Sequence, residues 1–280
     1  MADNGKLLFG VDESEYRAWD RAHFSALKLM LQGKSLAHVR HYMDTPSEAT
    51  PAMDMGKALH WRVFESHKFD YHVHIAESGV TRAQKAWREK VEYFDGKVIL
   101  TSAEGAAVNH MAWIVRSHPS VKALFEARYC FEGSLKDGVH CPVAKFHLPR
   151  KGRPDYYSKD LAVLADLKSC QDASLESFQK AIYNFRYDAQ AAFYRDMLMR
   201  AGYPVEHCLL IAVEKTEPFG CAVYRLEDDV LNMAYNDLDA EQEVMAGAYR
   251  DGNWPGYTTE VQDIALPPWA MRKHTEWRLQ

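Results

Sequence analysis

The chain has 280 residues, of which 47% are hydrophobic and 26% are charged, and its formal net charge is −5 at pH 7. This composition is typical of a globular protein, and the length suits one large domain or two small ones with a full core. The negative balance argues against a protein that coats nucleic acid generally, although a local basic groove remains possible because clustered carboxylates can be metal ligands.

Neither the hydropathy pattern nor the cysteines indicate secretion or membrane insertion. The N-terminal sequence MADNGKLLFGVDES lacks the basic and apolar regions of a signal peptide, and no apolar run approaches the roughly 20 residues that a membrane span needs. The five cysteines are widely spread and include no CxxC pair, which disfavours a disulfide framework, a zinc ribbon or an iron–sulfur site. We therefore expect a cytoplasmic protein with reduced thiols and no membrane partner.

Helical patterns dominate the first part of the chain. Residues 12–44 are predicted to be helical, and a loop rich in proline, serine and threonine follows at 45–54. Further helices are predicted at 55–69, 81–94, 102–119 and 121–127.

The hydrophobic period changes after residue 130. Consecutive strands are predicted at 139–149, 152–158 and 161–169, joined by the short polar turns KGR and SKD. A long helix, 174–202, follows, with a cap at Ser174 and a stop at Gly202. Two more strands at 208–216 and 221–227, a helix at 228–252 and a Pro/Trp-rich tail at 253–270 complete the order.

This order of elements predicts an α/β or α+β fold with one central mixed sheet. We expect a single domain over residues 1–280 with three parts. They are a mainly helical part at 1–130, the catalytic sheet and helix at 131–226, and the C-terminal helix and tail at 227–280.

The stretch GRPDYYSKDLAVLADLKSC places two carboxylates and one ammonium at the ends of a predicted hairpin. If its two strands pair, Asp155 and Asp166 lie at the same edge of the sheet, and Lys168 points to the same face as Asp166. Two adjacent carboxylates repel unless a divalent cation lies between them, and hard oxygen ligands suit Mg²⁺ or Mn²⁺. Lys168 would then assist the attacking water and stabilise charge on the phosphorane. The alternative is a solvated surface ion pair, since D-x-K alone is common.

The same segment resembles the PD-(D/E)xK nuclease core, and residues 15–273 resemble the exonuclease domain of RecE (exonuclease VIII) in the RecB-like group. The resemblance implies a restriction-endonuclease-like fold with an N-terminal helical elaboration. It also implies that Asp155, Asp166 and Lys168 form the active centre, with the backbone carbonyl of Leu167 as a further metal ligand.

Other matches to the family extend this candidate site. Gly56 and His60 fall on its G-x-x-x-H helix, whose histidine is a metal ligand, and an imidazole ligand would favour good activity with Mn²⁺. Gln190 and Tyr194 fall on its Q-x-x-x-Y element, where both side chains share one helical face and would hold the DNA backbone or a carboxylate beside the metal. The alternatives are a packed or surface histidine and a core tyrosine.

Glu132 precedes the predicted sheet where relatives often carry an additional acid. It is either a ligand for a second metal or a plain surface acid. The C-terminal tail also matches the family, and we interpret Trp254 and Trp269 in it as packing residues.

Contacts to DNA are expected to be mainly with phosphates. The first candidates are the cations that flank Asp155, namely Arg150, Lys151 and Arg153. Lys180 and Arg186 are weaker candidates. For each of these residues the alternative is a solvated surface charge.

The resemblance implies a Mg²⁺-dependent exonuclease that resects the 5′-ended strand of double-stranded DNA and leaves a 3′ single strand for recombination. It further implies a ring-shaped homo-oligomer, a RecT-like single-strand annealing partner and a phage or prophage origin. Two alternatives stay open: a DNA-end-binding protein on an inactive nuclease fold, and an endonuclease on the same core. An iron–sulfur nuclease of the Cas4/AddB-like type is disfavoured, since no cysteine follows Cys221.

Overall fold

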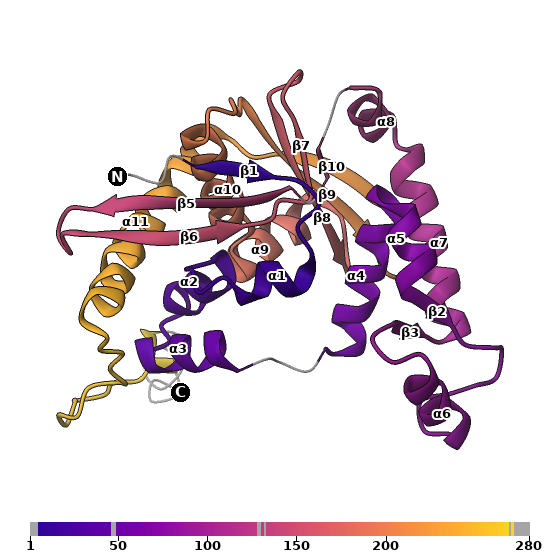
Figure 1. Cartoon of the computed structure of the whole chain (residues 1–280), viewed down its shortest axis with the longest axis horizontal. Coiled ribbons are helices and arrows are strands. Elements are labelled where there is room, and N and C mark those ends of the chain that lie inside the picture. The colour runs from indigo at the N-terminus through magenta and orange to yellow at the C-terminus, as the bar shows by residue number, and fades with distance from the viewer. Residues whose placement is uncertain (1–4, 46–48, 128–129, 132, 269, 272–280) are drawn as a thin grey trace, which may run out of the picture.

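The apolar segment Val163–Cys170 forms β8, the middle strand of the main sheet. The computed structural model describes residues 5–45, 49–127, 130–131, 133–268 and 270–271 (Figure 1). In the main sheet the strand order is β10–β9–β8–β7–β4. Strand β8 runs parallel to β9 and antiparallel to β7, so this sheet is mixed, as predicted. The neighbouring strands are β4 (Cys130–Phe131), β7 (Tyr156–Ser158), β9 (His207–Glu214) and β10 (Cys221–Arg225).

Helices cover both faces of the main sheet, which explains why residues 163–165 of β8 and most of β9 are apolar on both sides. Leu167 packs in the core cluster beneath α4 (Pro51–Phe64) and α7 (Ser102–Ser117). Leu164 packs in the opposite cluster with α10 and α11. The parallel pair β8 and β9 needs a crossover connection, and two helices supply it. The helices beyond α4 and α7 near the sheet are α5 (Ser66–His72), α8 (Pro119–Glu126), α9 (Leu175–Phe185), α10 (Tyr187–Arg200) and α11 (Asp228–Asp251).

The region 134–152 forms a hairpin in a separate sheet, and the prediction of one central sheet is wrong here. Pro142 and its neighbours form a turn, with Lys145 at φ 52°, where we predicted a continuous strand. Lys151 and Gly152, predicted as part of the KGR turn, are instead the last residues of the second strand of this hairpin. Its strand order is β1–β5–β6, with β1 (Lys6–Leu8), β5 (Ser134–Cys141) and β6 (Phe146–Gly152).

A small unit projects from α5 at the lower right of Figure 1. It contains the parallel strands β2 (Val73–Ile75) and β3 (Val98–Leu100), with α6 (Lys85–Tyr93) between them. Trp87 and Ile99 form its own small core. No described helix is long and apolar enough to cross a membrane.

Two predicted long helices are interrupted, each for a local reason. Residues 12–44 contain three helices, because the segment before Phe24 is extended and Ala22 exchanges backbone hydrogen bonds with Pro149 and Lys151. The three are α1 (Glu13–Ala18), α2 (Phe24–Leu31) and α3 (Leu36–Asp44). The helix predicted at 174–202 breaks at Arg186, which adopts the left-handed conformation with φ 56°.

Arg150 is a buried structural cation that joins both strands of the hairpin to two helices. Its guanidinium hydrogen-bonds both carboxylate oxygens of Asp137 on β5 and the side-chain oxygen of Gln242 on α11, 2.7 Å away. It also pairs with Asp196 on α10 at 2.8 Å. The side chains of Arg150 and Asp137 are 1% and 2% exposed, so bulk water cannot replace a lost partner.

Replacing Asp137 with alanine should therefore lower the free energy of unfolding by about 3–5 kcal/mol, as measured by urea denaturation. The matched control is Glu176→Ala, which removes an exposed carboxylate from its pair with Lys180 and should change stability little. Equal effects of the two variants would contradict the structural role of Arg150.

Candidate active site

The hairpin of β7 and β8 brings Asp155 and Asp166 together at one edge of the main sheet. Tyr156 pairs with Ala165, so Asp155 and Asp166 occupy the next position of the ladder. The carboxylate of Asp155 is held there by the backbone N–H of Leu167, which donates to its Oδ2 at 2.8 Å. The juxtaposition expected from the sequence is therefore present in the structure.

His60 reaches this pair from the other side, on α4. Its Nδ1 lies 3.2 Å from Oδ1 of Asp155. Helix α4 starts with Pro51 directly after Thr50, whose hydroxyl caps the first turn by accepting from the N–H of Met53 at 3.3 Å. A defined start sets the rotation of the helix and hence which face carries His60.

Lys168 completes the cluster on the same face of β8 as Asp166. Its ammonium pairs with Asp166 and donates to Oε1 of Gln190 on α10 at 2.8 Å. It also lies 4.7 Å from the ring centroid of Tyr187. Sequence reasoning missed Tyr187. Its place three residues before Gln190 on the predicted helix puts both side chains on one helical face, and this spacing could have identified it.

Tyr194 supports Gln190 from one helical turn further on. The Gln190 side chain is close enough to influence the pKa of the Tyr194 hydroxyl. The Tyr194 ring packs against the backbone of Gly152 on β6, where an added Cβ would lie 2.9 Å from Cε1 of the ring. The predicted pair therefore shares one face, and the second sheet sets its position.

The electrostatics of the cluster separate its two carboxylates. For Asp155, burial opposes ionisation, but His60, Lys168 and the Leu167 N–H outweigh it, and the pKa is lowered. For Asp166, burial and the charge of Asp155 raise the pKa to about 6, even though Lys168 opposes the shift.

The two basic groups respond to these carboxylates. Burial alone would lower the pKa of His60, but Asp155 and Asp166 outweigh it and the pKa is raised. The pKa of Lys168 is likewise raised, because the two carboxylates outweigh the effect of burial. Lys168 is therefore an ammonium at neutral pH.

The donor set fits a divalent cation with oxygen ligands. Both oxygens of Asp166 are buried, and neither accepts a hydrogen bond of normal geometry. Burying a carboxylate in this way is costly unless a cation compensates it, and the Lys168 ammonium offsets only part of the cost. Within the described ranges no three acidic, histidine or cysteine side chains converge on one point. Mg²⁺ tolerates this, because it commonly keeps several waters beside one or two carboxylates.

The three cations first expected to contact DNA are committed to the protein itself, which corrects that expectation. Arg150 is fully buried. The ammonium of Lys151 donates to the carbonyls of Tyr16, Arg17 and Trp19 at 2.7–3.2 Å. Arg153 is bound by Ser134, Glu13 and the carbonyl of Val11. Segment 11–19 folds over Lys151 and Arg153, which the sequence pattern did not reveal.

The remaining candidates for DNA contact, Arg186 and Lys180, pair with carboxylates other than Asp155 and Asp166. Arg186 pairs with Asp188 and Asp237, and Lys180 pairs with Glu176 on the surface. Glu132 and Trp269 lie outside the described residues. Trp254 packs edge-on against Tyr249, with ring centroids 5.2 Å apart.

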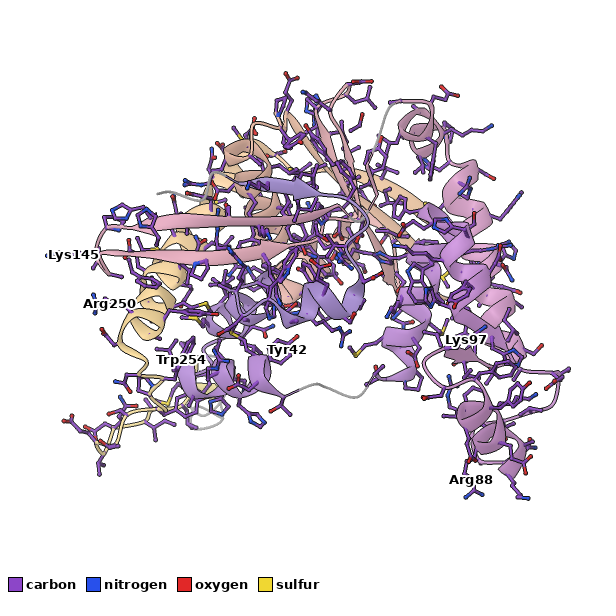
Figure 2. All side chains as sticks on the ribbon, in the orientation of Figure 1. Tyr42, Arg88, Lys97, Lys145, Arg250 and Trp254 are labelled. Carbon is purple, nitrogen blue, oxygen red and sulfur yellow. The ribbon has the colours of Figure 1, made fainter. Side chains whose placement is uncertain are left out.

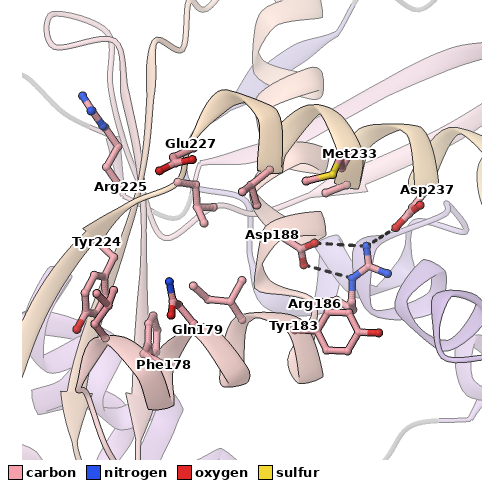
Figure 3. A pocket seen from close by; sticks show the side chains of 15 residues that line it. Phe178, Gln179, Tyr183, Arg186, Asp188, Tyr224, Arg225, Glu227, Met233 and Asp237 are labelled. Atoms are coloured by element: carbon pink, nitrogen blue, oxygen red, sulfur yellow. Dashed lines mark hydrogen bonds and ion pairs between the residues drawn. The ribbon is translucent and has the colours of Figure 1, made fainter.

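A cavity of about 620 Å³ lies apart from this cluster, between α9, β10 and the start of α11 (Figure 3). Its lining is mostly apolar and includes Phe178, Tyr224 and Met233, with the ion pairs of Arg186 at one end. None of the candidate catalytic residues lines it. Volume alone would therefore point to a place without suitable chemistry, and the buried carboxylates identify the site instead.

Comparison with known proteins agrees with this architecture. A family model described as "PDDEXK-like domain of unknown function (DUF3799)" matches residues 23–266. The chain is also similar to the crystal structure of a "Putative exonuclease" from Eubacterium rectale. The TM-score is 0.64 at 10% sequence identity, and the match covers 94% of this chain and 98% of that one. No curated protein matches the chain.

At this identity the structural likeness shows the fold alone, and the fold is a mixed sheet between layers of helices as in the PD-(D/E)xK core. The family match spans most of the chain. The chain thus belongs to the PDDEXK-like family whose model it matches over residues 23–266.

Proposed function

We propose that this protein is a metal-dependent deoxyribonuclease. The observation that carries the proposal is the buried carboxylate of Asp166, which accepts no hydrogen bond of normal geometry and lies beside Asp155 and the ammonium of Lys168. A structural ion pair has no need of a second carboxylate at the same point, whereas hydrolysis of a phosphodiester uses a bound cation and a protein cation together. The family match and the exonuclease-like fold support the same reaction class.

Asp155, Asp166 and the backbone carbonyl of Leu167 are the groups that would hold Mg²⁺ or Mn²⁺, with His60 as a nitrogen ligand. Such a cation polarises a phosphate and lowers the pKa of the attacking water. Lys168 faces the same point as a fixed positive charge and would stabilise the negative charge of the transition state. Gln190 orients that ammonium through its 2.8 Å hydrogen bond.

The finer activity that we propose is RecE-like: digestion of double-stranded DNA from the 5′ end, leaving 3′ single strands for annealing. A ring-shaped homo-oligomer and a RecT-like annealing protein as partner belong to the same proposal. Its support is the resemblance of the GRPD, DLK, G-x-x-x-H and Q-x-x-x-Y elements. Two other readings are tested alongside: DNA-end binding without hydrolysis, and endonuclease activity.

Purified protein should degrade linear duplex DNA in Mg²⁺ and leave supercoiled circular DNA intact, with the 5′-ended strand lost first when each end is labelled separately. Asp166→Asn and Lys168→Met should each lower the rate by at least about 100-fold, because the first removes a ligand of the metal and the second removes a cation that stabilises the transition state. The matched controls are Asp160→Asn and Lys159→Met, in the exposed turn of the same hairpin.

Cleavage of the supercoiled circle would favour the endonuclease instead. Digestion that survives Asp166→Asn would refute the site, and binding of DNA ends without any metal-dependent digestion would favour the DNA-end-binding protein.

The affinity for the metal should depend on pH through Asp166. An ordinary aspartate of pKa 3.8 is already ionised at pH 5, whereas Asp166, with a pKa of about 6, takes up a proton as the pH falls through that value. Because ligands must be deprotonated, the Kd for Mn²⁺ should rise at least about tenfold per pH unit below 6, and the raised pKa of His60 should extend the pH dependence above that value. Calorimetric titration of the DNA-free protein measures this.

His60→Gln should weaken binding of Mn²⁺ and remove the titration of the imidazole, but keep the break near pH 6, since that break belongs to Asp166. Loss of the break in this variant would assign the titration to the imidazole. Asp160→Asn should leave the whole profile unchanged.

A further inference from the structure

A row of aromatic rings and lysines runs from α4 across α5 to the unit formed by β2, β3 and α6. We call it the aromatic–basic strip, and it consists of Lys57, Trp61, Tyr71, His72, Tyr93, Phe94 and Lys97. Figure 2 labels Lys97 on this side of the molecule, opposite Lys145 at the far end of the hairpin. The elements that carry the strip lie together at the right of Figure 1.

The members of the strip touch one another in sequence along the surface. The ammonium of Lys57 lies 4.8 Å from the centre of the Trp61 ring, and Trp61 stacks on His72 at 5.1 Å. His72 meets Tyr71 edge-on at 4.8 Å, and the ammonium of Lys97 lies 5.5 Å from the centre of the Tyr71 ring.

The strip continues beyond Lys97 onto the small unit. The Lys97 ammonium is also 5.8 Å from the centre of the Phe94 ring, which Tyr93 meets edge-on at 4.8 Å. Tyr71 and Tyr93 are 70% and 81% exposed, so two large rings present their faces to solvent. Trp61, at 8% exposed, forms the floor.

The strip carries two lysine ammonium groups, and the charge of one of them, Lys57, acts on Glu13 and Asp54 nearby. Within the described residues, neither Lys57 nor Lys97 forms an ion pair with a carboxylate. Burial and the charges of Lys57, Lys68 and Lys97 together lower the pKa of His72, so its ring stays neutral at pH 7. A chain with a net charge of −5 thus has two lysines without a carboxylate ion pair in this strip, which begins on the helix of its candidate site.

The strip begins on the helix that carries the candidate metal ligand. Lys57 and Trp61 flank His60 on α4, and His60 contacts Asp155. A polynucleotide with a phosphate at the carboxylates could therefore continue directly onto the strip. Alternating stacking rings and cations are the surface that single strands use, whereas a duplex keeps its bases stacked inside and offers no free base faces to Tyr71 or Tyr93.

We propose that the aromatic–basic strip binds single-stranded DNA leading to or from the site at Asp155 and Asp166. Bases stack on Tyr71 and Tyr93, and phosphates contact Lys57 and Lys97. The proposal rests on the proposed function for its polynucleotide substrate. It adds that the bound DNA is single-stranded and names the surface that binds it.

Fluorescence anisotropy with labelled oligodeoxythymidine, in EDTA so that no digestion occurs, tests the proposal on the full chain. Tyr71→Ala should raise the Kd about fivefold or more, since it removes one stacking face. Lys97→Gln should raise the Kd and reduce the slope of log affinity against log salt by about 0.7. The matched controls are Tyr183→Ala, another exposed tyrosine, and Lys145→Gln, and both should leave the Kd unchanged.

An unchanged Kd in Tyr71→Ala and Lys97→Gln, with unchanged melting temperatures, would overturn the proposal. Equal weakening of a blunt duplex and of the single strand would also overturn it, by showing a general phosphate surface. The nuclease assay tests the proposed function independently. If the wild type digests DNA but the strip variants bind single strands normally, only the proposal for the strip is refuted. Strip-dependent binding without any digestion removes only the nuclease.

Discussion

The two faces of strand β8 have different chemistry, and the candidate site depends on that difference. Val163, Ala165 and Leu167 pack beneath α4 and α7, whereas Asp166 and Lys168 point to the opposite face at the end of the strand. Pairing with β9 on one side and β7 on the other prevents β8 from slipping, because a shift of one residue would turn the charged groups into an apolar core. Burying the Asp166 carboxylate at this fixed position is better explained by a role in a reaction than by a contribution to the stability of the fold.

The cations of this chain divide into two groups with different physical roles. One group donates hydrogen bonds to carboxylates and carbonyls of the protein and consists of Arg150, Lys151 and Arg153. These bonds connect the N-terminal segment, the hairpin and two helices. Lys57 and Lys97 also rest on aromatic rings, as those three cations do, but within the described residues neither forms an ion pair with a carboxylate. Proximity to Asp155 in the sequence did not show which cations are bound within the protein. Burial and the presence of a fixed partner do.

The parts of the site that are close in sequence could be predicted, and the parts built by distant contacts could not. The polar SKD sequence between two apolar runs sufficed to predict the hairpin, and the period of a strand then placed Asp166 and Lys168 on one face. His60 was suggested only by resemblance, since nothing local distinguishes it from the other 12 of the 13 histidines. The burial of Arg150 escaped prediction because a charged residue is ordinarily exposed and its partners Asp196 and Gln242 are far along the chain. The left-handed turn at Arg186 is likewise set by its ion pairs with Asp188 and Asp237.

The contact between Gly152 and the Tyr194 ring gives the second sheet a part in the site, although that sheet carries no candidate catalytic group. Because the backbone itself touches the ring, no flexible side chain intervenes to absorb a displacement. A shift of β6 against the main sheet would displace the Tyr194 ring, one turn along α10 from Gln190, which holds the ammonium of Lys168. The hairpin thus limits how far α10 can move toward the second sheet. The geometry around Asp155 and Asp166 therefore depends on how the two sheets are aligned.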